Sequence, residues 1–356
     1  MAQEQAPNLE CTAEAFRRYC ETARNDNAPL YEQMAGRIRE DPELLEIAAH
    51  ARSDRPTAYL FFDAVQYLVL GGTDHEVARY YPSVTEDALP AAFAYPVFRD
   101  FCRKNADLLR YLVANHNNQT NEVGRMSAML PVIGEAARRG GGKPIGIVEV
   151  GPSAGLNLIF DRYLFDYGRT VWGDMDSSVR VVCRLEDDRL PPLEKGIPNV
   201  AYRIGLDIEP IDLSSDDSAR WMLSSTWADH RDLSLMQHQA IEVLRQDPPQ
   251  IVQGDALQVG EVLKDVPMDL TLVVYQSFML MYLTPEDRER FLAVLAEESR
   301  RRPVYFVSML GAGIGGGTRR AKVDLHSWVD GRYEVQQMVE GHSHGRSIKW
   351  VAGATA

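Results

Sequence analysis

The sequence predicts an α/β protein in which a helical N-terminal domain precedes a doubly wound, mostly parallel sheet that ends in an antiparallel hairpin. The first 140 residues show the 3.6-residue periodicity of helices, and a glycine-rich break follows at residues 140–142. Short β-branched runs then alternate with helical stretches, which is typical of a parallel sheet covered on both faces. We therefore expect a helical cap domain over residues 1–140 and a sheet domain over residues 141–356.

The N-terminal half carries clear helix signals. Asp41, Pro42 and Glu43 supply an N-cap acceptor, a first-turn proline and an early acid before an apolar run. Residues 56–70 are apolar on most faces and stop at two glycines, which predicts a buried central helix. Residues 98–113 and 120–137 have helical periodicity, with a kink expected at Pro131.

The second half reads as strands joined by helices. The predicted strands are residues 145–150, 200–205, 250–253, 270–275 and 304–310, followed by a hairpin of 332–340 and 346–352 at the sheet edge. Thr284 and Pro285 begin the helix after the fourth strand. An insertion at about residues 163–199 separates the first two strands and is a candidate cover for a pocket.

Composition and charge narrow the classes of partner. The chain has 356 residues, with 38 Lys and Arg against 51 Asp and Glu, so its formal charge is −13. Phosphate backbones and anionic membranes would repel it, and we expect a small-molecule substrate, no nucleic acid and no membrane. The first residues lack a signal-peptide pattern, which predicts a cytoplasmic protein. A homo-oligomer, a hetero-oligomer and a monomer are all consistent with the sequence. Four widely spaced cysteines without metal-ligand spacing predict no metal.

A glycine loop follows the first predicted strand. The pattern E-x-G-x-S-x-G at residues 149–155 resembles the first motif of class I S-adenosylmethionine-dependent methyltransferases, with Ser153 replacing the central glycine. The resemblance implies that Gly151, Ser153, Gly155 and Asn157 contact the cofactor, that Asp207 binds its ribose and that Asp255 faces its adenine. The alternative is that the glycines make a tight turn and that the two aspartates cap helices.

Nearly the whole chain, from about residue 28 to 350, also resembles a bacterial family, domain of unknown function 2332. The most specific matches are Gln-Thr-Asn-Glu-Val-Gly-Arg (119–125), Ser-Ala-Gly-Leu-Asn (153–157) and His-Gly-Arg (344–346). The resemblance implies a helical domain followed by a methyltransferase-like core. Where the family has Phe-His-Ser and Asp-Leu-Asn-Pro, this chain has Tyr-Gln-Ser (275–277) and Asp-Ile-Glu-Pro (207–210). It also has Trp-Ala-Asp-His (227–230) for Trp-Pro-Glu. The histidine of Phe-His-Ser, which is the obvious general base of the family, is therefore absent from this chain.

The remaining candidate residues are polar and lie near the predicted strand ends. The catalytic candidates are Glu122, Arg125, Tyr275 and Gln276, and the substrate-binding candidates are Gln119, Asn121, Arg162, Ser277, His344 and Arg346. Structural alternatives exist for several of them. Glu122 and Arg125 have the spacing of a helix ion pair, Arg162 has the setting of a fold-holding charge, and His344 has that of an exposed turn histidine. The glycine run at residues 311–317 favours a mobile loop over a phosphate loop.

Three functions are consistent with these residues. The first is a biosynthetic small-molecule methyltransferase using S-adenosylmethionine, in which proximity supplies most of the catalysis while Gln276 and Glu122 orient the substrate. The second is a cofactor-free enzyme on the same fold that performs an elimination or an intramolecular ring closure, with Arg125 or Arg162 binding an anionic leaving group. The third is a non-catalytic scaffold for a partner subunit.

Overall fold

The chain folds into two compact units that are interleaved along the sequence. The computed structural model describes residues 9–52, 55–119, 121–193, 196–311 and 320–353. Residues 1–120 and 214–238 form the first unit, and residues 121–213 and 239–356 form the second. No helix in these described stretches is long and apolar enough to cross a membrane.

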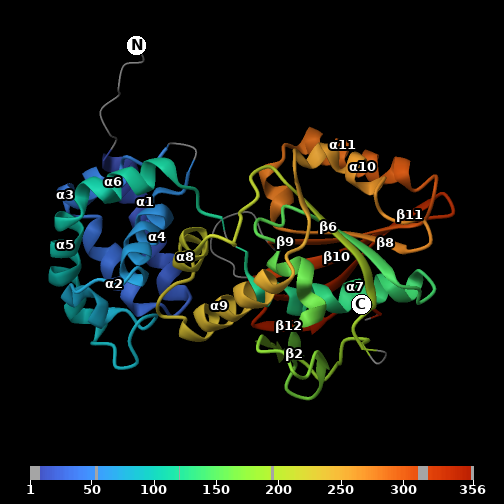
Figure 1. The fold of residues 1–356 in the computed structure, drawn as a ribbon, viewed down its shortest axis with the longest axis horizontal. Coiled ribbons are helices and arrows are strands. Elements are labelled where there is room, and N and C mark those ends of the chain that lie inside the picture. The colour runs from blue at the N-terminus through green and yellow to red at the C-terminus, as the bar shows by residue number, and fades with distance from the viewer. Residues whose placement is uncertain (1–8, 53–54, 120, 194–195, 312–319, 354–356) are drawn as a thin grey trace, which may run out of the picture. The chain divides into compact units, whose positions relative to one another are not determined.

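The first unit is built from helices (Figure 1). They are α1 (Leu9–Asn25), α2 (Pro29–Ile38), α3 (Pro42–Ala48), α4 (Thr57–Leu70), α5 (Ala94–Lys104), α6 (Ala106–Asn115) and α8 (Asp216–Ser224), with short turns η1 (Glu76–Tyr80) and η2 (Ala91–Phe93). The long helix α9 (Arg231–Gln246) begins in this unit, and its second half belongs to the other one.

Local signals placed α3 and α4 correctly. The Asp41 carboxylate accepts the N–H groups of Glu43 and Leu44 at the start of α3, which confirms the predicted N-cap. Helix α4 ends at Gly71, also as predicted. The single helix predicted over residues 98–113 is two helices, because the chain breaks at Asn105, whose side-chain amide bonds back to the carbonyl of Phe101.

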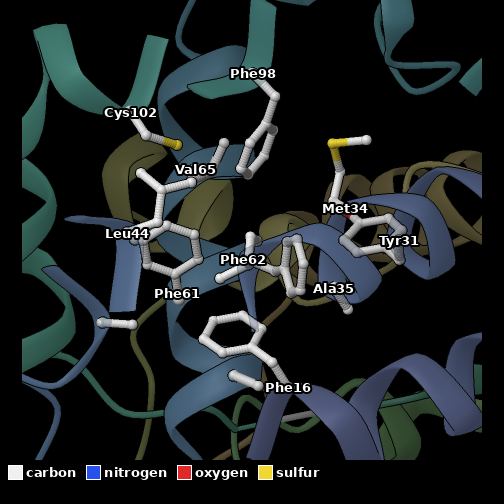
Figure 2. Close-up of a cluster of buried hydrophobic side chains, with 14 of the residues drawn as sticks. Phe16, Tyr31, Met34, Ala35, Leu44, Phe61, Phe62, Val65, Phe98 and Cys102 are labelled. Carbon is white, nitrogen blue, oxygen red and sulfur yellow. The ribbon is translucent and has the colours of Figure 1, made fainter. Parts of the chain in front are cut away.

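The core of the first unit is aromatic (Figure 2). Phe16 meets both Phe61 and Phe62 edge to face, with ring centroids 5.7 Å apart. Segment 214–238 joins the same core, since Trp227 stacks on Tyr31 with a centroid distance of 5.6 Å. The helical unit is therefore discontinuous in sequence, which differs from the single boundary expected at residue 140.

The second unit contains a nine-stranded sheet in the order β5-β12-β11-β10-β9-β8-β1-β6-β7. Its strands are β1 (Ile145–Val150), β5 (Arg184–Leu185), β6 (Val200–Asp207), β7 (Ile251–Gln253), β8 (Thr271–Ser277), β9 (Val304–Gly311), β10 (Arg320–Val329), β11 (Arg332–His342) and β12 (Ser347–Trp350). The five strands from β9 to β7 are parallel, as expected. The fold is thus α/β.

Helices cover both faces of this sheet. Figure 1 shows α10 (Val259–Leu263) and α11 (Pro285–Glu298) on one side and α7 (Met126–Arg139) on the other. Helix α7 continues through Pro131 and packs against β8 to β12. Because these contacts tie it to the sheet, the boundary between the units precedes α7, and the predicted helix over 120–137 is the short η3 (Val123–Arg125) followed by α7.

The C-terminal hairpin is larger than predicted. β11 and β12 pair antiparallel, but β11 also pairs with β10, which the sequence reading did not assign. The alternation of Ala321, Val323 and Leu325 with polar residues is the signal that identifies β10. The insertion forms a separate three-stranded sheet of β2 (Leu164–Asp166), β3 (Val171–Gly173) and β4 (Arg180–Val182), before β5 joins the main sheet. The glycine run lies outside the described residues except for Gly311.

Candidate functional site

The topology of the sheet indicates where a ligand binds. β1 has β6 on one side and β8 on the other, so the strand order reverses at β1. In open α/β sheets, ligands bind outside the carboxyl ends of the strands at such a switch point. The ends of β1 and β8 lead into Gly151 and Phe278, respectively.

The glycine loop after β1 has left-handed backbone at three positions. Gly151, Ser153 and Gly155 have φ values of 79°, 56° and 85°. The space beside both glycines is occupied by the chain itself. A Cβ on Gly151 would lie 2.9 Å from Met279, and one on Gly155 would lie 2.9 Å from Pro249. The glycines thus permit a tight turn against neighbouring side chains.

The two aspartates of the proposed cofactor set serve the backbone. Asp207 is buried, and its carboxylate accepts the N–H groups of Ser153 at 2.7 Å and Glu209 at 2.9 Å. Asp255 is exposed and forms a capping box with Gln258 at the start of η5 (Ala256–Gln258). Asp207 therefore holds the backbone of the glycine loop in place, and Asp255 caps the start of η5 after β7.

These residues do not fit S-adenosylmethionine in the way the motif implies. The glycine positions face side chains of the same protein, and both Asp207 oxygens hold backbone groups. The element after the loop is η4 (Leu156–Arg162), a short 3₁₀ segment kinked at Ile159, so no long helix points its N-terminus at the loop. Cofactor binding stays a prediction for the six residues assigned to it, Gly151, Ser153, Gly155, Asn157, Asp207 and Asp255.

A buried polar cluster lies behind the loop. Glu149 is 1% exposed and receives a hydrogen bond from the Tyr275 hydroxyl at 3.3 Å, since β1 and β8 place the two residues side by side. Burial raises the pKa of Glu149 to about 8, and Asp207 adds to that rise. The Asn157 side chain is equally buried, and neither of its polar atoms has a hydrogen-bond partner of good geometry. The Tyr275 hydroxyl also lies 3.1 Å from the carbonyl oxygen of Asn157, so Tyr275 links β8 to η4.

A second cluster joins residues from three distant parts of the chain. Glu122, which directly precedes η3, contacts Nδ1 of His344, 222 residues later in the turn between β11 and β12. The Arg125 guanidinium lies 3.2 Å from the same carboxylate and donates to the Ser277 hydroxyl at 3.3 Å. It also stacks 4.8 Å from the ring centre of Phe278. The cluster therefore sits at the carboxyl end of β8.

The electrostatics of this cluster keep the carboxylate charged. Burial raises the pKa of Glu122, but the positive charge of His344 in its protonated form, together with Arg125 and Arg346, outweighs burial and lowers that pKa to about 2. The two arginines keep their charges when His344 is neutral, and both still lower the pKa of Glu122. An ionised carboxylate that accepts the Nδ1–H of a histidine fixes the ring and leaves the Nε2 lone pair to take a proton. Glu122 and His344 can therefore act together as an oriented general base.

Close backbone packing fixes the geometry of the cluster. The Ser127 hydroxyl donates to the carbonyl of Gly345 at 2.7 Å. A Cβ on Gly345 would lie 1.8 Å from the carbonyl oxygen of Gly124. Asn121, next to Glu122, accepts the N–H of Leu156 at 2.8 Å and so ties η3 to the glycine loop. The three sequence signatures named above thus meet in one place.

The remaining candidates occupy other settings. Gln276 is fully buried. Its side-chain N–H₂ donates to the Ser308 hydroxyl and to the carbonyl of Met309, and its side-chain oxygen accepts the N–H of Leu280. Arg162 pairs with Asp247. Gln119 belongs to the first unit, whereas residues 121–125 of its signature belong to the second. No group of three or more potential metal ligands occurs within the described part of the chain.

The sequence reading did not connect Glu122 with His344. It treated the first as a neighbour of Arg125 and the second as a turn histidine, and the Glu122–Arg125 ion pair is indeed present. Nothing local links positions 222 residues apart. The available signal was that each of the two residues lies in a distinctive family signature.

Comparison with known proteins identifies the family. The family model described as "Uncharacterized protein conserved in bacteria (DUF2332)" matches residues 13–350. A search of curated proteins gave no match.

Proposed function

This chain belongs to the DUF2332 family of bacterial proteins, and we propose that it is an enzyme that catalyses proton transfer on a small molecule at the carboxyl edge of β8. The observation that carries the proposal is the contact between the Glu122 carboxylate and Nδ1 of His344. A carboxylate-oriented histidine is a recurring form of general base, and here it replaces the histidine that the sequence lacks at position 276.

The charges around the pair favour one class of reaction. Arg125 and Arg346 both lower the pKa of Glu122 through their positive charges, so the cluster is net positive when His344 is neutral. A positive site stabilises a leaving group that departs as an anion. This favours the elimination or ring-closure chemistry expected of a cofactor-free enzyme.

The proposed elimination or ring closure needs only the substrate and the side chains of this cluster. Nε2 of His344 takes a proton from the substrate, and the electron pair left behind forms a double bond or closes a ring. The bond to the leaving group breaks, and its electrons leave with that group toward the arginines. Glu122 stabilises the resulting imidazolium, and Arg125 holds Glu122 in place through their 3.2 Å ion pair.

The test is a turnover screen with the full-length protein. We expect it to convert a compound in a bacterial small-molecule extract, as followed by mass spectrometry, without added S-adenosylmethionine. His344→Gln should slow the conversion by about 100-fold or more, the usual worth of a general base. His326→Gln is the matched control, because His326 lies on β10 and bonds to Tyr333.

Two results would overturn the proposal. One is conversion that His344→Gln leaves unchanged, or no conversion at all. The other is a methylated product that forms only with added S-adenosylmethionine, because that product would support the methyltransferase hypothesis instead. Calorimetric titration with S-adenosylmethionine, on the wild type and on Asp207→Ala, tests that alternative independently of turnover.

A further inference from the structure

The first unit contains a half-open surface pocket of about 500 Å³, a volume within the range of small-molecule sites. Helix α6 supplies its apolar wall through Leu108, Tyr111 and Leu112, which are spaced to share one helix face. Leu108 is 46% exposed and Tyr111 is 59% exposed, although both side chains are large and apolar. Exposed apolar side chains that line a concave surface indicate a ligand site.

The opposite wall carries one positive and one negative charge. Arg220 of α8 lies 4.3 Å from the ring centre of Tyr67 and donates to the Tyr67 hydroxyl at 2.9 Å and to Asp217 at 2.6 Å. Gly71 makes room for the guanidinium, since a Cβ there would lie 2.6 Å from Nη1. Asp217 also accepts a hydrogen bond from the Tyr67 hydroxyl, so the two charges are paired with each other and with Tyr67. Their side chains are 62% and 34% exposed, so a ligand in the pocket meets this ion pair with both charges partly accessible.

The polar side of the pocket includes a histidine packed against a tryptophan at a tilted angle. The ring of His116 lies 4.1 Å from that of Trp221, centre to centre, and its Nδ1 lies 3.3 Å from the carbonyl of Leu112. Trp221 is anchored in turn, because its indole N–H donates to the carbonyl of Asn117 at 2.9 Å. Three helices and one loop thus form a fixed frame around a site with an apolar side and a two-charge side.

We propose that this pocket binds a free α-amino acid with an apolar or aromatic side chain. The carboxylate faces Arg220, the ammonium faces Asp217, and the side chain lies on the exposed Leu108 and Tyr111. A simple anion would be repelled by Asp217, and a simple amine would be repelled by Arg220. A zwitterion presents the opposite charge to each of them, and its apolar part covers the exposed wall.

Titration calorimetry on the full-length protein tests this site, with L-phenylalanine and L-leucine as probes. N-acetyl-phenylalanine, which lacks the ammonium, and phenethylamine, which lacks the carboxylate, should each bind at least tenfold more weakly than phenylalanine. Arg220→Met and Asp217→Asn should weaken phenylalanine binding by the same factor. Arg110→Met is the matched control, since Arg110 pairs with Asp107 on the same helix α6 and does not line the pocket.

The result that would overturn the proposal is the absence of binding to the folded wild type at millimolar amino acid. Equal affinity for phenylalanine and either of its one-charge analogues would also overturn it. If Arg220→Met fails to fold, Asp217→Asn and the two analogues decide the matter by themselves.

Discussion

Gly345 lies directly against the backbone of Gly124, so that a side chain on Gly345 would place its Cβ 1.8 Å from the Gly124 carbonyl oxygen. This contact brings the turn that carries His344 onto the segment that carries Glu122 and Arg125. Gly345 also has a φ of 73°, which L side chains rarely adopt. Two independent constraints therefore require glycine at this position.

The first prediction concerns that contact. Gly345→Ala should lower the free energy of unfolding by more than about 1–3 kcal/mol, which is what strained backbone alone costs, and should separate His344 from Glu122. Chemical denaturation measures the first effect, and a crystal structure of the variant shows the second. Gly331→Ala is the control, since Gly331 also has a positive φ but nothing within 4 Å of its Cβ position. Equal losses in both variants would mean that strain alone, without the Gly124 contact, explains the effect.

The second prediction concerns how segment 214–238 is held. Helix α2 begins after Ala28, which cannot cap it, and the carboxylate of Asp229 accepts the N–H of Leu30 at 3.1 Å instead. Asp229→Ala should destabilise the protein by about 1–2 kcal/mol, as removal of a helix cap does. Asp232→Ala, an exposed change three residues later, should cost less than about 0.5 kcal/mol. An Asp229→Ala variant with unchanged stability would contradict the capping role.

The third prediction is a pH dependence of stability. Burial raises the pKa of Asp63 from its ordinary 3.8 to about 8, although a hydrogen bond from Asn118 opposes the rise. Between these two values the folded state keeps a proton that the unfolded state releases. Stability should therefore fall as the pH rises from 4 to 8, by at most about 1.4 kcal/mol per pH unit from this group.

Asp63→Asn should remove that contribution. The variant should gain stability over the wild type as the pH rises toward 8, and urea denaturation at several pH values measures the difference. Glu149 adds a similar fall, since its pKa is also raised to about 8, so Glu149→Gln should show the same trend. A difference between Asp63→Asn and the wild type that is independent of pH would contradict the raised pKa.

Local sequence patterns predicted most of the elements but not their grouping. The parallel strands, the Asp41 cap and the turn at Gly71 follow from spacing within a few residues. The placement of α7 on the sheet and of Trp227 in the helical core depends on contacts between residues far apart in the chain, which periodicity does not encode. The strand β10 was missed although its alternation was present in the sequence.

The site shows the same division. Glycine spacing predicted either a cofactor loop or a tight turn after β1, and the structure has left-handed backbone at Gly151 and Gly155 there. Spacing cannot reveal that Met279 and Pro249 fill the space beside the glycines or that Asp207 binds the loop. The polar signatures identified Glu122, Arg125 and His344 one by one, and only the fold brings them together.

The most direct test of the central claim is nitrogen-15 NMR of the His344 ring in the wild type and in Glu122→Gln, at a pH where the ring is neutral. We predict that the wild-type ring carries its proton on Nδ1, because the Glu122 carboxylate accepts it there, and that Nε2 is bare. The variant should shift toward the form protonated on Nε2. A wild-type ring protonated on Nε2, or one that Glu122→Gln leaves unchanged, would contradict the oriented general base.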